Sequence, residues 1–420
     1  ENFGSSFEGK ISCFNLTMFQ SRKVKVHLNK FQKELVHRNF GASRFLWNWG
    51  LERLNKWWEE NKDTPKDQRP KRPSAFDLGN EIRKLKKEDS NFMWLNECDS
   101  QIPKFVFDNL SKAFQRFWSH SASYPKFKSK KELRQSYSSV SPTVPRLEDG
   151  NHLRLAKLGR VKFYNKGYIP DVKLKRATLS TDGIDYYCSV LFDYPVESLP
   201  LVNKEVGIDL GLKSTVTCSD GKVFCWNPLK RSLRRIKLSQ RHFSRCHKGS
   251  KRRTRAKIAL AKRNRRLMRQ HTDFIHKMTS FLVRENQAIR METLNTKGMM
   301  KNHHLARSIG EQSFYEIRRQ LEYKCVRAGR TFELVDPWYP SSQLCSCCGE
   351  RHRAMKDLSK RTFKCPFCGY TADRDLNAAL NILKYCTDEE SETYARGDSS
   401  SLETGRTSGR LASCRSENHR

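Results

Sequence analysis

Two Cys-x-x-Cys pairs near the end of the chain constrain its local fold more than any other feature. Sixteen residues separate the second cysteine of the first pair from the first cysteine of the second pair, a spacing typical of two zinc knuckles. Four thiolates at about 2.3 Å form a closed tetrahedral site in which zinc is structural. The sequence therefore predicts a zinc ribbon over residues 345–368. Its ligands are Cys345, Cys348, Cys365 and Cys368, and Cys347 is an additional thiol that the spacing disfavours.

The charge of the chain limits its partners. The 420 residues include 81 Lys or Arg against 45 Asp or Glu, a net charge of +36. A compact protein with this surplus repels itself unless a polyanion neutralises it, so nucleic acid is the expected partner. No apolar run approaches the roughly 20 residues of a membrane helix, and no secretory leader is visible. We expect no membrane partner, and cysteines that occur in ligand pairs indicate a reducing, cytoplasmic compartment.

The first half of the chain changes from helical to strand-like patterning. Apolar residues at helical spacing are followed by short alternating runs between Gly, Asp and Pro turns, which indicate a small antiparallel barrel. The basic, alternating run after Met18 predicts a strand that completes this barrel. The predicted segments are an upstream extension (1–17), the first barrel strand (18–32), a helical lobe (33–122), the barrel (123–200) and, at the other end, a disordered tail (387–420) whose composition is poor in apolar residues.

A densely basic stretch follows a predicted strand over residues 205–210 and its return strand through Val216. The 40 residues from Lys230 to Arg269 contain 18 Lys or Arg and no Asp or Glu. Ala, Leu and Ile recur within them, so we expect one or two long helices. Like charges at i and i+4 repel without a counter-charge, which favours phosphate contact over a solvated face. The residues predicted to bind nucleic acid are Lys251, Arg252, Arg253, Arg255, Lys262, Arg263, Arg265 and Arg266.

Carboxylates from three regions of the chain form the second candidate site. Asp209 lies in the buried strand pattern VGIDLG, Glu292 follows the short apolar run AIRM, and Asp373 and Asp375 begin a helix just after the ribbon. Each alone is more often a surface or capping carboxylate, and Asp373 is a candidate N-cap. Together they match the acids of a two-metal nuclease, in which one ion activates water and the other stabilises the leaving oxygen. Oxygen ligands select Mg²⁺ or Mn²⁺ rather than zinc.

Six stretches resemble the TnpB family, the transposon-encoded relatives of type V CRISPR effector nucleases. They run in the family's order over residues 18–386 and read FGASRFLWNWGL, YPKFKSK, GIDLGLKSTVT, METLNTKGMMKNHHLARSI, YPSSQLCSCCG and DRDLNAALNI. The resemblance implies a multidomain α+β and α/β fold, with a wedge β-barrel and helical recognition lobe before a ribonuclease H-like (RuvC) domain. That domain spans 201–344 and 369–386, includes the basic region 230–269, and is interrupted by the zinc ribbon. The catalytic acids carried over by motif are Asp209, Glu292 and Asp375.

The resemblance also implies the partners and the reaction. Family members bind a guide RNA made from the transposon end and cut DNA paired to that guide, so double-stranded DNA and its displaced single strand are expected partners in a prokaryotic cytoplasm, on the nucleoid. The chain has Thr293 where the family often has Asp and Ala372 where it often has His, and neither change removes an assigned ligand. Three alternatives stay open: a guide-dependent DNA-binding regulator that does not cut, a transposase that joins strands, and an ordinary zinc-ribbon DNA-binding protein.

Overall fold

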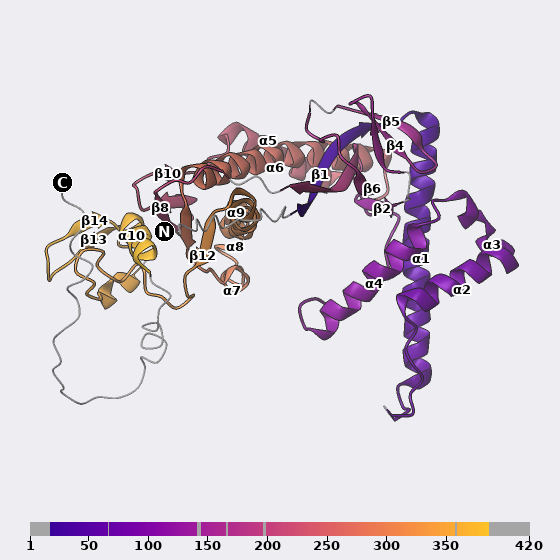
Figure 1. Cartoon of the computed structure of the whole chain (residues 1–420), viewed down its shortest axis with the longest axis horizontal. Coiled ribbons are helices and arrows are strands. Elements are labelled where there is room, and N and C mark those ends of the chain that lie inside the picture. The colour runs from indigo at the N-terminus through magenta and orange to yellow at the C-terminus, as the bar shows by residue number, and fades with distance from the viewer. Residues whose placement is uncertain are drawn as a thin grey trace, which may run out of the picture. The chain divides into compact units, whose positions relative to one another are not determined.

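The structure of the chain is a computed structural model (Figure 1). It describes residues 17–65, 67–140, 144–164, 167–195, 199–357 and 359–385. The contacts divide the chain into two compact units, one comprising Glu1–Glu197 with Leu229–Met268 and the other Ser198–Pro228 with Arg269–Arg420. The predicted extension over residues 1–17, apart from Thr17, and the predicted tail over residues 387–420 lie outside the described residues.

Helices of the first unit occupy the segment for which the sequence predicts a helical lobe. They are α1 (Lys30–Asn61), α2 (Ala75–Glu88), α3 (Ser90–Met93), the short 3-10 helix η1 (Trp94–Glu97) and α4 (Ile102–Trp118). The start of α1 is fixed because Asn29 and Gln32 exchange side-chain-to-backbone hydrogen bonds of 2.8 and 3.1 Å, a reciprocal cap. α4 packs against both α1 and α2. Gly50 allows the close approach of α1 and α4, since a Cβ there would lie 2.9 Å from the Phe107 ring.

The strands of the first unit form an open seven-stranded sheet, not the closed barrel that the sequence predicts. The order is β2-β6-β7-β1-β5-β4-β3. Closing a barrel requires the two edge strands to pair, and no ladder joins β2 to β3 within the described residues. β3 has only three residues and pairs with β4, while α1 and α4 pack against β2. The strands are β1 (Thr17–His27), β2 (Gln135–Ser139), β3 (Arg146–Glu148), β4 (His152–Leu155), β5 (Gly159–Phe163), β6 (Leu174–Thr181) and β7 (Tyr186–Pro195).

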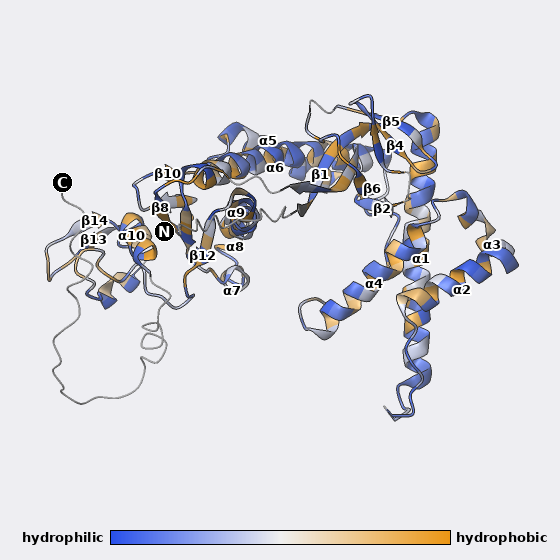
Figure 2. Cartoon of the chain, viewed as in Figure 1, coloured by the Kyte–Doolittle hydropathy of each residue, from blue (hydrophilic) through white to orange (hydrophobic). Residues whose placement is uncertain are grey.

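The densely basic stretch consists of two helices, α5 (Lys230–Arg245) and α6 (Lys251–Glu285). Figure 2 shows α5 as mainly hydrophilic. The turn between the helices is held by Arg253, whose guanidinium donates to the carbonyls of Phe243 and Cys246 at 3.1 and 2.8 Å. The prediction of one or two long helices is therefore confirmed. Among the helices of the described residues, none combines the length and apolar character needed to cross a membrane.

A five-stranded mixed sheet forms the centre of the second unit. Its order is β10-β9-β8-β11-β12. β8 is antiparallel to β9 and parallel to β11, which is parallel to β12. Apolar residues of β8 and β11, including Val206, Ile208 and Ile289, join Ile317 and Leu321 of α9 in one core. The elements are β8 (Glu205–Asp209), β9 (Val216–Cys218), β10 (Val223–Phe224), β11 (Ala288–Met291), β12 (Thr331–Leu334), α7 (Thr296–Met299), α8 (Ala306–Gln312) and α9 (Phe314–Ala328).

The ribbon and the last helix complete the second unit. The ribbon has its own small core, in which Phe363 and Met355 pack with Cys345 and Cys365. Helix α10 packs against β8. The elements are η2 (Arg353–Lys356), β13 (Thr362–Lys364), β14 (Thr371–Asp373) and α10 (Arg374–Lys384).

Candidate functional site

Parallel strand pairing brings two of the candidate acids to one edge of the sheet. Asp209 is the last residue of β8, and Glu292 directly follows β11. Met291 lies opposite Ile208 in the register of the two strands, so both acids follow the same point of the sheet. The Leu210 backbone N–H donates to Glu292 Oε1 at 2.7 Å. The backbone just after Asp209 therefore fixes the carboxylate of Glu292.

Asp375 joins these two acids from the first turn of α10. Asp373 is the N-cap of this helix and accepts hydrogen bonds from the N–H groups of Asp375 and Leu376 at 2.9 and 3.3 Å. The capping role considered for Asp373 from the sequence is thus confirmed. The side chain of Asp375, the second residue of the helix, is left to interact with the charges of Asp209 and Glu292.

The acidic site is electrostatically unfavourable without a cation. Burial, together with the charges of Glu292 and Asp375, raises the pKa of Asp209 well above its usual value. Burial and the charge of Asp375 raise the pKa of Glu292 to about 7, against the opposing effect of the Leu210 hydrogen bond. Burial and the charge of Asp373 also raise the pKa of Asp375. Like charges that share a buried site shift pKa values in this way, and such shifts cluster at functional sites.

Two cations that the sequence did not single out lie beside Asp375. Arg361, from the ribbon, places Nη1 3.9 Å from Asp375 Oδ1. Lys213, from the loop after β8, joins Arg361, Asp373 and Asp375 in the lining of a pocket of ≈ 230 Å³. Neither residue's sequence neighbours indicate that its side chain lies beside a carboxylate, so only the fold identifies them. Within the described ranges, the four cysteines are the only group of potential metal ligands whose ligand atoms all lie within 4.8 Å of one another. The oxygens of the three carboxylates do not all lie this close together.

Gly207 sets the distance between α10 and the sheet. A Cβ on Gly207 would lie 2.5 Å from the Leu383 backbone nitrogen and closer still to the Ala379 carbonyl oxygen. Both contacts are with backbone, which cannot rotate away as a side chain can. Glycine at this point of β8 therefore allows α10 to lie directly on the strand that carries Asp209.

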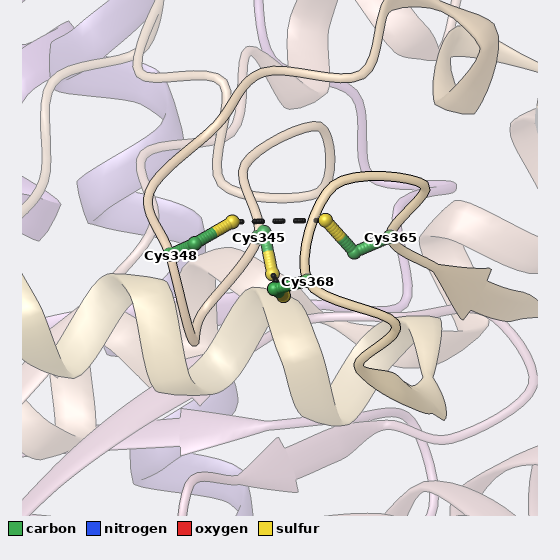
Figure 3. Close-up of side chains that lie close together, drawn as sticks. All are labelled: Cys345, Cys348, Cys365 and Cys368. Carbon is green, nitrogen blue, oxygen red and sulfur yellow. Dashed lines mark hydrogen bonds between the residues drawn. The ribbon is translucent and has the colours of Figure 1, made fainter.

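The four cysteines predicted as ligands converge as a zinc site requires. Figure 3 shows their side chains meeting from two loops of the ribbon. The Sγ atoms of Cys345 and Cys368 are 3.7 Å apart, and those of Cys348 and Cys365 are 3.6 Å apart. Sulfurs bound to one tetrahedral zinc at about 2.3 Å are separated by about 3.8 Å, whereas a disulfide brings them to about 2.05 Å. The geometry and the thiolate chemistry fit zinc, and Cys347 lies outside the cluster.

The eight basic residues predicted to bind nucleic acid differ in their surroundings. Six are exposed on α6: Lys251, Arg252, Arg255, Lys262, Arg263 and Arg266. Arg253 is partly buried in the turn that it closes. Arg265 donates to Asp182 and Asp185 at 3.0 and 2.7 Å, so its charge is already neutralised within the protein. Nucleic-acid binding stays a prediction for the six exposed residues. Arg265 instead has a structural role that its sequence neighbourhood did not indicate.

Three family models match successive parts of the chain. A model described as "Helix-turn-helix domain" matches residues 18–63, one described as "Probable transposase" matches 189–303, and one described as "Cas12f1-like, TNB domain" matches 314–382. Residues 18–63 hold most of strand β1 and the single helix α1, so the first description does not fit the structure there. The third match contains the cysteine cluster and Asp375.

Two curated relatives match most of the chain, and a third matches half of it. A protein of Streptomyces pristinaespiralis named "Putative RNA-guided DNA endonuclease" is 33% identical over 367 residues, which cover 86% of this chain and 88% of that one. The Escherichia coli (strain K12) protein "Putative RNA-guided DNA endonuclease InsQ" is 30% identical, covering 84% of this chain and 89% of that one. "TnpB-like protein L79" of Acanthamoeba polyphaga mimivirus is 30% identical over 229 residues, which cover 50% of this chain and 43% of that one.

Proposed function

This chain belongs to the TnpB family, and from that premise we propose that it is a transposon-encoded, RNA-guided DNA endonuclease. One observation carries the proposal: Asp209, Glu292 and Asp375 lie close enough for their charges to interact, and burial together with neighbouring carboxylates raises the pKa of each. Mutual repulsion of this kind destabilises the fold unless a cation occupies the site. A protein that needed these residues only for stability would gain from apolar or amide replacements.

The topology of the second unit supports a ribonuclease H-like (RuvC) assignment. Numbered along the chain, its five strands lie in the order three-two-one-four-five, with the first strand antiparallel to the second and parallel to the fourth. The proposed acids follow the first and fourth strands and begin the last helix. In this proposal the nuclease domain comprises residues 201–344 and 369–386, and the ribbon is an insertion that separates Glu292 from Asp375.

The donor set fits hard divalent cations. All three side chains offer carboxylate oxygens, the ligands that Mg²⁺ and Mn²⁺ prefer. Two such ions bound there would supply an activated water and stabilise the leaving oxygen of a phosphodiester. The protein's own contribution is to hold the carboxylates: the Leu210 N–H fixes Glu292. Since Glu292 has a pKa of about 7, cation binding displaces protons, and cation affinity rises with pH up to that value.

The basic helices provide the surface for nucleic acid in this proposal. The six exposed Lys and Arg side chains of α6 would contact phosphates, and the net charge of +36 favours binding of both guide RNA and target DNA. Base pairing to an RNA from the transposon end would select the DNA, while the protein would read duplex shape, a short adjacent motif and the displaced strand. We place this activity in the cytoplasm of a prokaryotic cell.

Cleavage by the unmutated protein is the decisive test. RNA that copurifies with the expressed chain is sequenced, and DNA matching that RNA is incubated with the complex and Mg²⁺. We expect Asp209→Asn to bind this DNA as the unmutated protein does and to cut it at least 100-fold more slowly, because removal of a central electrostatic group typically costs about 10²-fold or more. Asp273→Asn, at an exposed position of α6 that pairs with Lys277, is the matched control and should cut normally.

The same assay separates the alternatives. Guide-dependent binding by the unmutated complex without any cutting in Mg²⁺ or Mn²⁺ would make the protein a regulator. Joined transposon ends in place of cut target would make it a strand-transferring transposase. Binding that needs no RNA would leave an ordinary zinc-ribbon DNA-binding protein.

A further inference from the structure

A buried asparagine of α10 contacts the first zinc knuckle. Asn377 has no exposed surface (0%). Its Nδ2 donates to the Leu344 carbonyl oxygen at 2.7 Å, and its Oδ1 accepts from the Ser346 N–H at 2.9 Å. These two backbone groups flank Cys345, one of the four cysteines of the cluster. One side chain therefore holds the peptide groups on both sides of a zinc ligand.

A second asparagine repeats this contact one helical turn later. Asn381 is 4% exposed, and its Nδ2 donates to the carbonyl oxygens of Ser341 and Leu344, both at 2.8 Å. Helix residues four apart share a face, so Asn377 and Asn381 form a polar strip along the side of α10 that meets the knuckle. Buried polar groups that lose their partners are costly, which makes this contact specific for one position of the helix.

The strip and the acidic site lie on different sides of the same helix. Asp375 is two residues before Asn377, and helix residues two apart point in different directions. The charge of Asp375 acts on Asp209 and Glu292, Asn377 contacts the knuckle, and the backbone at Ala379 and Leu383 lies against Gly207 of β8. Rotation or sliding of α10 would therefore break the asparagine contacts and displace the carboxylate together.

We infer that Asn377 and Asn381 are positioning residues that make the orientation of Asp375 depend on zinc in the ribbon. The knuckle backbone between residues 341 and 346 is held on one side by the cysteine cluster and on the other by these two side chains. Zinc bound to Cys345 would hold the two neighbouring backbone groups in place: the Leu344 carbonyl oxygen, which accepts from both asparagines, and the Ser346 N–H, which donates to Asn377. Loss of zinc frees this backbone, and α10 loses the contacts that set its rotation. The consequence for cleavage rests on the proposed role of Asp375 as a cation ligand, but the coupling of zinc to α10 does not.

Hydrogen exchange of α10 tests the coupling without any cleavage. Peptides covering residues 374–385 are followed by mass spectrometry in zinc-loaded protein, after removal of zinc with a chelator, and after zinc is restored. In the unmutated protein we expect exchange to become about tenfold faster or more without zinc and to recover with it, since the loss of one or more buried hydrogen bonds corresponds to a factor of about ten. In Asn377→Ala, α10 should exchange fast even with zinc bound, so zinc should change its exchange less than threefold.

Asn381→Ala is the milder variant, because the Leu344 carbonyl oxygen still accepts a hydrogen bond from Asn377. The effect of zinc on α10 exchange in this variant should lie between those in the unmutated protein and in Asn377→Ala. This variant also serves if Asn377→Ala does not fold. Gln270→Ala, which truncates an exposed amide on α6, is the matched control and should keep the full zinc dependence. Equal protection of α10 with and without zinc in the unmutated protein would overturn the inference. An Asn377→Ala protein with the normal zinc dependence would do the same.

The Mg²⁺ dependence of cleavage distinguishes positioning from general stability. A displaced Asp375 should raise the Mg²⁺ concentration needed for half-maximal rate by about tenfold in Asn377→Ala, with a smaller fall in the rate at saturating Mg²⁺. A fall in saturating rate alone, with an unchanged Mg²⁺ midpoint, would contradict a positioning role. If the unmutated complex never cuts, the proposed function fails, while the exchange measurement still decides whether zinc controls α10.

Discussion

Replacing Glu292 by glutamine should stabilise the Mg²⁺-free protein at alkaline pH while removing a proposed cation ligand. The amide keeps the shape of the side chain and an oxygen that can accept the Leu210 N–H bond, but it carries no charge. The folded protein raises the pKa of Glu292 from its usual 4.5 to about 7, so the folded state binds more protons than the unfolded state between these values. Stability contributed by this group is therefore lost as pH rises through about 7.

The magnitude follows from the shift. Each pKa unit corresponds to about 1.4 kcal/mol, which gives about 3 kcal/mol for Glu292 above pH 7. Glu292 retains some contact with solvent, so we expect about 2–3 kcal/mol. For a folding unit of about 150–250 residues, this corresponds to a rise of about 4–12 °C in Tm. The difference should be largest near pH 8.5 and should fall below about 1 kcal/mol near pH 5, where the folded unmutated protein carries a protonated Glu292.

Thermal unfolding of zinc-loaded protein in Mg²⁺-free buffers between pH 5 and 8.5 measures this difference. Hydrogen exchange of β8 and β11 reports the same change locally. Added Mg²⁺ should stabilise the unmutated protein by mass action and the glutamine variant much less. The difference in Tm between the two proteins should therefore shrink or change sign. Glu350→Gln, at an exposed position, is the control. A Glu292→Gln protein that follows the unmutated Tm at every pH would refute the buried, like-charged site.

Three further perturbations test the surroundings of the site. Gly207→Ala should cost about 1–3 kcal/mol of stability by pushing α10 off β8. Gly310→Ala on helix α8, where an added Cβ would meet nothing within 4 Å, is the control and should be neutral or stabilising by up to about 1 kcal/mol. Equal Tm values for the two variants would contradict the close approach of α10 to Gly207. Cys365→Ser should lower zinc content from about one ion per chain to near zero and slow cleavage, and full-rate cleavage by zinc-free protein would show that the ribbon is dispensable. Arg255→Ala should reduce the salt dependence of binding to a 20-bp duplex by about one phosphate contact, whereas Arg265→Ala should lower Tm and leave that dependence unchanged.

Local sequence signals predicted the metal ligands and the acids. The cysteine spacing is a property of a few consecutive residues, so it identified the cluster without knowledge of the fold. Asp209 lies within one short apolar run and Glu292 follows another, which predicted that both acids lie at strands. That these strands are parallel neighbours was not predictable from their patterns, because the pairing joins residues more than 80 positions apart. Gly207 was visible beside Asp209, but the helix that requires it lies at the other end of the domain.

Long-range partners account for what the sequence did not predict. Arg265 stands in a run of cations, and nothing nearby indicates that Asp182 and Asp185 will neutralise it from 83 and 80 residues away. The strand-rich segment suggested a closed barrel because its alternation is that of a barrel strand. Closure depends on whether the outermost strands meet, and the short β3 pairs only with β4 among the described residues. The alternation of residues within a strand does not indicate which other strand, if any, pairs with it.

The place of α10 in the chain has a consequence for biosynthesis. Translation delivers all five strands of the central sheet before the ribbon and α10, and Asp375 leaves the ribosome roughly 80 residues after Glu292, a delay of about 4–16 s at bacterial elongation rates of ~5–20 residues per second. During that interval the face of β8 at Gly207 lacks its helix, and the acidic site lacks its third member. Under the proposed function, a nascent chain would begin to gather nucleic acid on its basic helices before its cutting site is complete.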